Sequence, residues 1–471
     1  MLRIYLVFLV ALVTSSCTLV DEYIKPKLET PANWSIEYPW HLSEPADQLK
    51  KGSWWEIFKD DDLNRLESLA LDQNPNLKIA MNRVEQAKSI ITITKASLYP
   101  EVDIMSGASR GIISQNKPTY EQSTMPITTS QNDFNLRLAV NYELDLFNRV
   151  KNTIKASKAS EESEEAQYEN IKLLLASEIA SDYFALCELD NEIEIVVKSI
   201  ELQRKALEFI KARYDLGIAN GIDLSQQQNQ LDTSLAQLDI LNSQRSQIEH
   251  ALAFLTGSFA NDFHIEKKSF SNVLPSIPAS LPSDVIQQRP DVAAAERMMA
   301  EANAQIGVAR AAFFPTINLS PLAGVESSSL STITNSSSFL WALGVSATQP
   351  LFNAGKIKAN VKISEINYQS SIEYYRQTVL RAMQEVEDGL SGNILLAKAE
   401  ENINRSVRSA KQSIHLTNAR YEGGLGIYLD VINSEQIHLA SQRRLIQNKG
   451  EQFQVAIYLI KALGGKWNAD I

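Results

Sequence analysis

Apolar residues recur every seven positions along one very long helical stretch, from about Val150 to Tyr214. One series is Ile179, Leu186, Ile193, Ile200, Leu207 and Tyr214, and a second consists of Tyr183, Leu189, Val196 and Ile210. A strict seven-residue repeat predicts helices that pack side by side with a left-handed twist. At 1.5 Å per residue such a helix is roughly 100 Å long. That length is typical of a coiled coil, a stalk or the wall of a tube.

The stretch before this helix changes from helical to strand periodicity. A first helix is predicted over 54–97, and Pro100 ends it. Apolar and polar residues then alternate over 134–144, which predicts a half-buried strand long enough to cross a bilayer within a β-barrel. A weaker strand begins at Val102, and a polar loop over 114–132 joins the two strands.

The second half of the chain repeats the order of the first. Asp223 recurs as Asp430 (430 − 223 = 207) and Gly257 as Gly464 (464 − 257 = 207), while Phe147 recurs as Phe352 (352 − 147 = 205). So steady an offset predicts an internal duplication. Each half then holds one long helix, two shorter helices and one strand hairpin, with the second pair of strands over 317–327 and 339–349.

These patterns divide the chain into six predicted segments. They are a signal peptide (1–16), a lipid-anchored N-terminal segment (17–59), a first repeat (60–257, hairpin about 101–146), a linker or equatorial region (258–288), a second repeat (289–464, hairpin about 316–351) and a C-terminal tail (465–471).

Four strands of membrane length cannot close a barrel alone, because bacterial barrels begin at eight strands. Edges left open in lipid would expose unpaired backbone groups at a cost of several kcal/mol each. We therefore expect a mainly α-helical protein with a membrane β part, whose strands are completed by other copies of the chain.

The first residues resemble a bacterial secretory leader. Arg3 precedes an apolar run from Ile4 to Val13, which is too short to span a bilayer as a mature helix. The small residues before Cys17 resemble a lipobox, although Thr14 stands where a leucine is usual, and this predicts lipid attachment at Cys17. Thr18, rather than an aspartate, favours the outer membrane. The alternative is an ordinary signal peptide with an incidental cysteine.

Composition excludes several classes of function. The formal charge of −11 and the pI near 5.2 do not fit nucleic-acid binding. The chain has two cysteines and five histidines without metal-ligand spacing, so we expect neither a metal nor a cofactor. We find no nucleotide-binding or hydrolase motif and expect no enzymatic activity. Cys187 lies among apolar residues and is expected to pack inertly.

Several short motifs together resemble one family. They are Leu281-Pro282-Ser283, Arg289-Pro290-Asp291, Ala302-Asn303-Ala304-Gln305-Ile306-Gly307, Ala311-Ala312-Phe313-Phe314-Pro315, Gln349-Pro350-Leu351-Phe352, and the pair Arg213-Tyr214 and Arg420-Tyr421. Over nearly all of the mature chain the sequence resembles the TolC-like outer-membrane efflux channels, in particular the lipoprotein branch that serves drug pumps of the resistance-nodulation-division type.

The resemblance implies a homotrimer. Four strands from each chain would form a twelve-stranded barrel in outer-membrane lipid, and the helices would form a periplasmic tube. Such channels passively export drugs and other toxic small molecules from an inner-membrane pump, to which a periplasmic adaptor protein connects them.

The resemblance also points to the second helical turn as the periplasmic gate. Asp430 would form a ring of three carboxylates in a trimer, and such a ring attracts cations. Relatives commonly carry a second acid where this chain has Asn433, so Leu429 is an alternative constriction. Tyr421 matches a family position implicated in holding neighbouring helices shut, Gly426 replaces a gating arginine of some relatives, and Asp223 is the first-half counterpart of Asp430.

Gly217 and Gly424 are candidates for contact with the adaptor. The competing explanation for these turns is local: the glycines would be helix C-caps, and the two aspartates N-caps of the return helices, the first of which is predicted over 224–255. Similarly, Trp341 and Phe339 would anchor the barrel at the lipid interface or, alternatively, pack as the core of the hairpin.

Two other functions stay open at this point. The same fold could be the exit duct of a type I protein-secretion system. A chain of a different class, a non-conducting coiled-coil scaffold, would explain the long helices but not the alternating strands.

Overall fold

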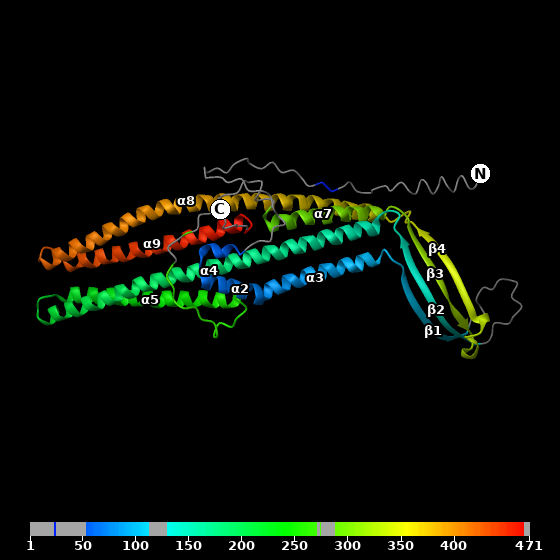
Figure 1. Cartoon of the computed structure of the whole chain (residues 1–471), viewed down its shortest axis with the longest axis horizontal. Coiled ribbons are helices and arrows are strands. Elements are labelled where there is room, and N and C mark those ends of the chain that lie inside the picture. Colours follow the sequence, from blue (N-terminus) through cyan, green and yellow to red (C-terminus); the bar gives the residue numbers. More distant parts are fainter. Residues whose placement is uncertain (1–22, 25–52, 113–129, 271–273, 275–287, 466–471) are drawn as a thin grey trace. The chain divides into compact units, whose positions relative to one another are not determined.

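The computed structural model describes residues 23–24, 53–112, 130–270, 274 and 288–465. The chain forms two compact units, each built from stretches of both sequence halves (Figure 1). Unit 1 comprises Met1–Pro26, Val84–Glu164 and Ala295–Tyr375, and unit 2 comprises Lys27–Arg83, Glu165–Ala294 and Arg376–Ile471. The predicted signal peptide, Cys17 and most of the predicted segment 17–59 lie outside the described residues.

Unit 1 contains a four-stranded antiparallel sheet in the order β1-β2-β3-β4. The strands are β1 (Glu101–Gly111), β2 (Gln131–Leu144), β3 (Thr316–Ser327) and β4 (Phe339–Thr348). All four strands predicted from alternation are confirmed, and the largest difference is that β2 begins at Gln131 rather than at Phe134. Two short 3-10 helices, η2 (Leu330–Thr332) and η3 (Ser336–Ser338), lie between β3 and β4.

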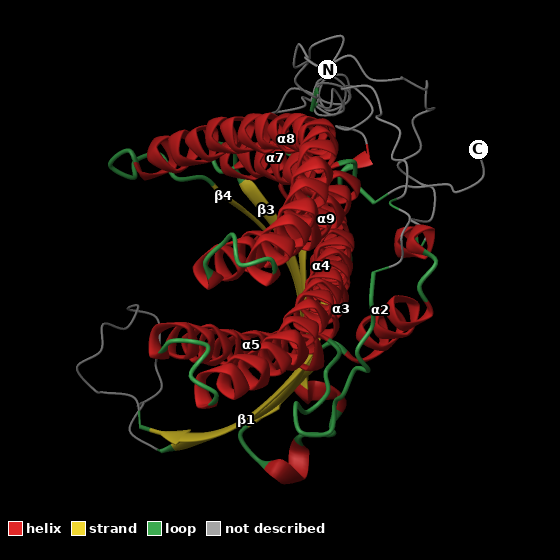
Figure 2. Cartoon of the chain, turned by 90° about the vertical axis from the view of Figure 1, so that its left-hand side faces the viewer, coloured by secondary structure: helices red, strands yellow, loops and turns green. Residues whose placement is uncertain are grey.

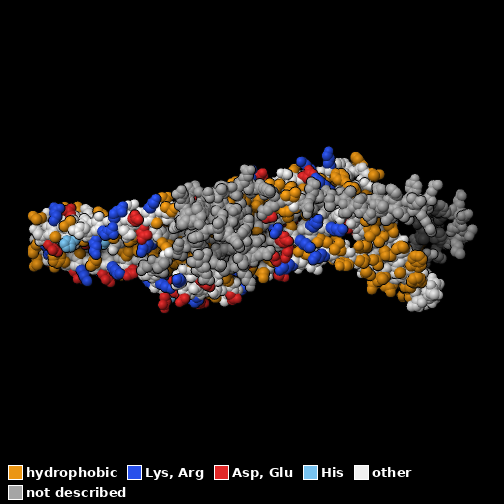
Figure 3. Space-filling model, turned by 45° about the horizontal axis from the view of Figure 1, so that its top comes forward, with side chains coloured by type: hydrophobic (Ala, Val, Ile, Leu, Met, Phe, Trp, Pro, Cys, Tyr) orange, Lys and Arg blue, Asp and Glu red, His pale blue; other side chains and the backbone are white. Residues whose placement is uncertain are grey.

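The strand register gathers apolar side chains on one face of this sheet. Ala323 of β3 lies opposite both Trp341 of β4 and Leu138 of β2, and Leu138 in turn lies opposite Ile104 of β1. Because residues two apart share a face, the apolar row extends along all four strands. Trp341 is 71% exposed and Ile104 76% exposed. Figure 3 shows hydrophobic side chains gathered over the strands.

Exposure decides between the two explanations for the aromatic residues of β4. Both Phe339 and Trp341 are exposed within the chain, so the prediction that they pack as a hairpin core is wrong.

The opposite face of the sheet is polar. Arg137 of β2 donates to a carboxylate oxygen of Glu326 of β3 at 2.7 Å. At the end of β2, Arg149 binds Glu143 through two hydrogen bonds of 2.8 and 2.6 Å. One apolar and one polar face are what a strand needs when it separates lipid from water.

The long helices occur as two pairs of equal length. They are α4 (Arg149–Asp215) and α8 (Lys356–Glu422), with 67 residues each, and α5 (Gly221–Leu255) and α9 (Tyr428–Ala462), with 35 residues each. The starts of both pairs are 207 residues apart (356 − 149 and 428 − 221). A further helix, α7 (Pro290–Ala311), precedes β3.

The seven-residue seam of α4 is buried over most of its length. In one cluster, Ile193, Val196 and Ile200 pack with Leu231 and Leu241 of α5. The seam prediction is wrong at Tyr214, which is 45% exposed. Tyr214 lies in the last turn of α4, with its ring beside Gly221, where the packing of α4 on α5 ends.

The single helix predicted over 54–97 is wrong, because the chain forms three elements there. They are η1 (Trp54–Phe58), α2 (Asp61–Gln73) and α3 (Pro75–Ala96). The second break is at Asn74, where proline at the next position disfavours helical geometry. The Asn74 side chain accepts a hydrogen bond from the Leu77 backbone N–H and donates one to the carbonyl oxygen of Leu255 at 2.7 Å.

Aromatic side chains join distant parts of the sequence in the core of unit 2. The Phe184 ring of α4 stacks on Phe453 of α9 with centroids 4.4 Å apart, and Phe58 of η1 lies 4.8 Å from Phe184. Phe270, which follows α5, stacks on the same Phe453 ring at 5.2 Å. Cys187 is buried nearby on α4, and burial raises the pKa of its thiol to about 12, in agreement with an inert packing role.

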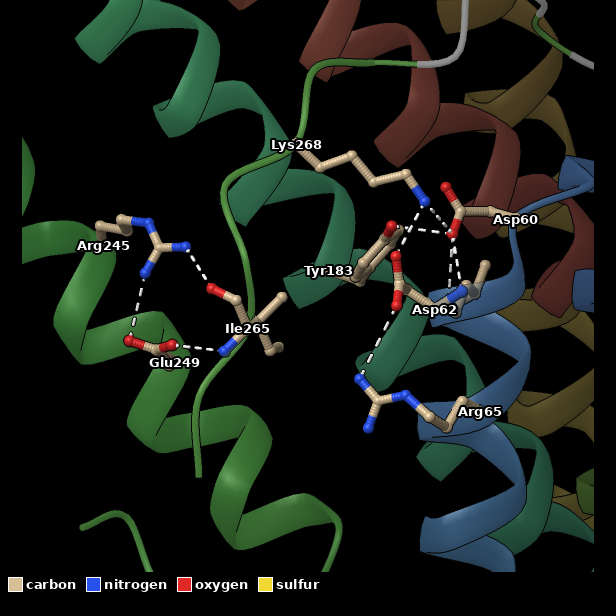
Figure 4. A network of polar contacts seen from close by, with 9 residues as sticks. Asp60, Asp62, Arg65, Tyr183, Arg245, Glu249, Ile265 and Lys268 are labelled. Carbon is tan, nitrogen blue, oxygen red and sulfur yellow. Dashed lines mark hydrogen bonds and ion pairs between the residues drawn. The ribbon is translucent and has the colours of Figure 1, made fainter. Parts of the chain in front are cut away.

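A buried ionic cluster ties the segment after α5 to α5 and α4 (Figure 4). Arg245 of α5 donates to Asp190 of α4 at 2.6 Å, to Glu249 at 3.1 Å and to the carbonyl oxygen of Ile265 at 2.8 Å. Glu249 in turn accepts the backbone N–H of Ile265 at 2.7 Å. Each of these three charged groups therefore has a partner of opposite charge.

A second part of the same network reaches the start of α2. The Lys268 ammonium donates to Asp60 and Asp62 at 2.9 Å each, and the Tyr183 hydroxyl donates to Asp60 at 2.8 Å. Asp60 also accepts the backbone N–H groups of Asp62 and Leu63 as the N-cap of α2. One carboxylate thus fixes α2, α4 and the segment after α5 together.

Arg289 plays a comparable part at the start of α7. Its buried guanidinium binds Asp291 through two bonds of 3.0 and 2.7 Å and Glu385 of α8 at 2.7 Å. It also donates to the carbonyl oxygen of Ala462 at the end of α9. The Arg-Pro-Asp stretch is therefore a structural junction of three helices in unit 2.

In the parts of the chain that the structure describes, no helix has both the length and the apolar character that crossing a membrane requires.

We predict that Arg245→Met destabilises the protein by about 3–5 kcal/mol, because Asp190 and Glu249 would keep buried charges without their partner. The matched control is Arg65→Met, since Arg65 is mostly exposed and lies 3.8 Å from Asp62. That change should cost less than about 1 kcal/mol. Chemical unfolding of the detergent-solubilised protein, followed by circular dichroism, measures both. Equal losses would contradict a structural role for the buried cluster.

We also predict a pH-dependent gain from Glu188→Gln. Burial, together with the charges of Glu192 and Glu451, raises the pKa of Glu188 from 4.5 to about 7. Since the native state binds this proton more tightly, stability is lost as the pH rises through this interval. The variant should melt with the parent near pH 4 and at a higher temperature than the parent near pH 8. Glu194→Gln, at an exposed position of the same helix, is the control, and an equal gain from it would refute the explanation.

Candidate functional site at the helix turns

The turns between α4 and α5 and between α8 and α9 are built alike. In Figure 2 unit 2 is seen from the end at which these two turns lie. Gly217 has a φ of 74° and Gly424 a φ of 72°. The residue after each glycine donates to the carbonyl five positions back, Ile218 to Arg213 and Leu425 to Arg420, both at 2.8 Å. This pattern is a Schellman C-cap, so the predicted capping role of both glycines is confirmed.

The predicted N-cap role of the two aspartates is wrong. The N-cap of α5 is Asn220, whose side chain accepts the backbone N–H of Asp223 at 2.9 Å. The N-cap of α9 is Ile427, which has no side-chain cap. α5 thus begins at Gly221 rather than at 224, and Asp223 and Asp430 lie inside the first turn of their helices. There their carboxylates face the positive end of the helix dipole.

An apolar cluster with two tyrosines forms the interior of the second turn. Ile210 of α4 packs with Tyr428, Val431 and Ile432 of α9, and the cluster includes Leu224 and Tyr421 at its edge. The rings of Tyr421 and Tyr428 are 5.1 Å apart. The Arg213 guanidinium lies 5.4 Å from the centre of the Tyr421 ring, within range of a cation–π interaction. Tyr421 therefore contacts both α4 and α9.

Uncharged amides join the two return helices. The Tyr428 hydroxyl donates to Gln227 of α5 at 2.8 Å, and the Gln227 amide donates to the carbonyl oxygen of Gln203 of α4 at 3.0 Å. Gln436 of α9 donates to Gln230 of α5. Burial raises the pKa of Tyr428, so this hydroxyl stays a donor at physiological pH. Sequence reasoning did not select Tyr428 or Gln227, whose pairing across 201 residues leaves no local signal.

A groove of about 470 Å³ lies between the first turns of α5 and α9. Leu429 and Asn433, two of the predicted gate residues, line it. The opposite wall carries Ser225 and Asn229 of α5. Asp430 is half-buried and does not line the groove, nor does Asp223. The structure thus brings Leu429 and Asn433 together with amide side chains and leaves the two aspartates apart from them.

Gly217 and Gly424 both present open surface. A Cβ built at either position meets no other atom within 4 Å, although the positive φ would strain any other residue there. Leu216, Ile218, Leu425 and Ile427 are exposed beside them. The ends of both turns are therefore apolar surfaces around a capping glycine.

The described residues contain no group of three or more histidine, cysteine, aspartate or glutamate side chains that could hold a metal ion. The polar groups of the turns are amides, hydroxyls and separate carboxylates. Such groups can bind and orient but do not form a catalytic arrangement.

Comparison with known proteins agrees with this architecture. A family model described as "Outer membrane efflux protein" matches residues 66–258 and 281–465. The solvent efflux pump outer membrane protein SrpC of Pseudomonas putida is 30% identical over 469 residues, which cover 98% of this chain and 97% of that protein. The cation efflux system protein CusC of Escherichia coli is 29% identical over 462 residues and 98% of each chain.

A solved structure gives the same result. The crystal structure of the CmeC outer membrane channel of Campylobacter jejuni superposes with a TM-score of 0.86 at 26% identity, covering 97% of this chain and 96% of that one. With four antiparallel strands, two pairs of long helices and a family match over both halves, the chain belongs to the outer membrane efflux protein family and is an outer-membrane efflux channel.

Proposed function

We propose that this chain is the outer-membrane subunit of a tripartite efflux system, which passively conducts small toxic molecules from an inner-membrane pump to the exterior. SrpC is named for solvent efflux and CusC for cation efflux. The two match this chain at nearly equal identity, so small molecules as a class are better supported than any single compound. A periplasmic adaptor protein would connect the channel to the pump, which supplies the energy.

The two-faced sheet is the observation that carries this proposal. Among the described residues, β1 and β4 each pair on one side only, which leaves two open edges. In lipid, unpaired backbone groups cost several kcal/mol each, so the edges have to meet strands of other chains. Three copies would provide twelve strands, with the apolar face towards lipid and the face of Arg137 and Glu326 towards the lumen.

We further propose that 60–257 and 289–464 are two copies of one ancestral unit, joined by the linker 258–288 and followed by a short tail (465–471). The equal lengths of α4 and α8 and of α5 and α9 support this, as does their common offset of 207 residues.

At the N-terminus we propose cleavage after residue 16 and lipid attachment at Cys17, which would add a second attachment to the membrane.

The second turn is the proposed periplasmic gate. In a trimer Asp430 would supply three carboxylates around the axis, and Leu429 and Asn433 would narrow the passage beside it. Tyr421 would hold α8 against α4 and α9 through its contacts with Arg213 and Tyr428. Asp223 would add a second acidic position. The open glycine caps at Gly217 and Gly424 suit close approach of the helical tips of an adaptor, since they offer no side chain to obstruct it.

Deletion of the gene should increase the sensitivity of the cells to solvents, metal cations or antibiotics. The purified protein should have the mass of three chains in detergent and conduct ions in a planar lipid bilayer. A folded monomer without conductance would refute the channel and favour the coiled-coil scaffold. Restored protein secretion without any change in drug sensitivity would instead favour a type I secretion duct.

For the gate, we predict that Asp430→Ala lowers the cation preference of the open channel. Three charges about 10 Å from a passing ion contribute on the order of 1 kcal/mol in water, so the change should be several-fold. Single-channel reversal potentials in a salt gradient measure it. The control is Asp232→Ala, which removes the same charge from an exposed position of α5. If both variants behave alike, Asp430 does not line the pore.

A further inference from the structure

A groove of about 330 Å³ runs between α7 and α8 in unit 1. Two of its lining residues, Ile306 and Ile366, are apolar, and two others, Arg310 and Lys362, are cationic. Arg310 donates to Glu365 at 3.0 Å. Since Glu365 is the one acid among the lining residues, the groove has a net positive charge.

The mature N-terminal segment passes close to this groove. Tyr23 is partly buried, and its hydroxyl lies 3.4 Å from the carbonyl oxygen of Glu296 on α7, to which it donates. Burial raises the pKa of this hydroxyl, and its electrostatic neighbours include Tyr368 and Tyr375 of α8. Tyr368 also lines the groove. Tyr23 therefore marks a point at which the N-terminal segment meets both helices.

The residues that precede Tyr23 match the groove in chemistry. Their order is Cys17, Thr18, Leu19, Val20, Asp21 and Glu22. Two apolar side chains correspond to Ile306 and Ile366, and two carboxylates correspond to Arg310 and Lys362. The segment contains no basic residue that would be repelled there.

We propose that residues 17–22 of this chain dock in the groove between α7 and α8, with Asp21 and Glu22 beside Arg310 and Lys362. The groove would then be a receptor for the lipidated N-terminus of the same chain. This inference rests on the proposed cleavage before Cys17, which makes residue 17 the start of the mature protein.

Chain length supports this docking. From Glu296 to the end of α7 at Ala311 the helix rises about 22 Å. The six residues from Tyr23 back to Cys17 span at most about 20 Å when extended. Cys17 can therefore reach the end of α7, where β3 begins only five residues later at Thr316. The groove would hold the lipid anchor beside the proposed membrane strands rather than on a free tether.

Cysteine crosslinking in the full chain tests the docking. The pair Asp21→Cys and Lys362→Cys should form a disulfide under mild oxidation, detected as a linked peptide by mass spectrometry. The control pairs Asp21→Cys with Asn360→Cys, an exposed position on the opposite side of α8. Two cysteines whose Cα atoms lie more than about 7 Å apart cannot be bridged, so the control should give no linked peptide. The native Cys187 is buried and does not compete.

Charge reversal provides a second, independent test. Arg310→Glu with Lys362→Glu should make the segment before Tyr23 more sensitive to protease, and adding Asp21→Lys with Glu22→Lys should restore protection. Absence of the linked peptide, or protection unaffected by the charge changes, would overturn the docking. Crosslinking to a different protein would indicate that the groove receives a partner instead. Conductance measured on the same variants separates these outcomes from failure of the proposed channel.

Discussion

Hydrogen bonding of the backbone is the constraint on which the membrane part of this protein depends. A sheet of four strands satisfies its inner strands but leaves one side of β1 and one side of β4 without partners in the described chain. Water could satisfy those groups, but lipid cannot. The register makes this constraint unavoidable, because it aligns apolar side chains from all four strands on one exposed face. The sheet is therefore incomplete as a single chain.

The helices solve a different problem, which is how to keep elements more than sixty residues long in fixed register. Apolar seams provide most of the burial, but they are nearly uniform along a helix and would permit sliding. Buried charges remove this freedom. Arg245 binds Asp190, Glu249 and a backbone carbonyl, and Arg289 binds Asp291, Glu385 and the end of α9. A shift of one turn would separate these groups and leave charges buried without partners.

The turns combine local and tertiary causes. Glycine with positive φ ends α4 and α8, and this follows from steric rules that apply to any helix. What lies next to these turns follows from contacts between helices: Tyr428 with Gln227, and Gln436 with Gln230. Neutral hydrogen bonds thus join α5 to α9 in a place where the resemblance to other channels suggested paired acids. The substitution of Asn433 for an acid is consistent with that neutral character.

The sequence by itself determined the features that repeat or alternate. Period two located the four strands almost to the residue, a period of seven located the α4 seam, and an offset of 207 residues related the long helices of the two halves. It failed at single residues whose role depends on a distant partner. The helix break at Asn74 had a local signal in Pro75, but its bond to Leu255 joins positions 181 residues apart. The caps of α5 and α9, the exposure of Phe339 and Trp341, and the charges gathered around Arg245 were likewise decided by tertiary structure. Periodicity is a property of neighbouring residues, whereas burial and charge pairing depend on what the fold brings beside them.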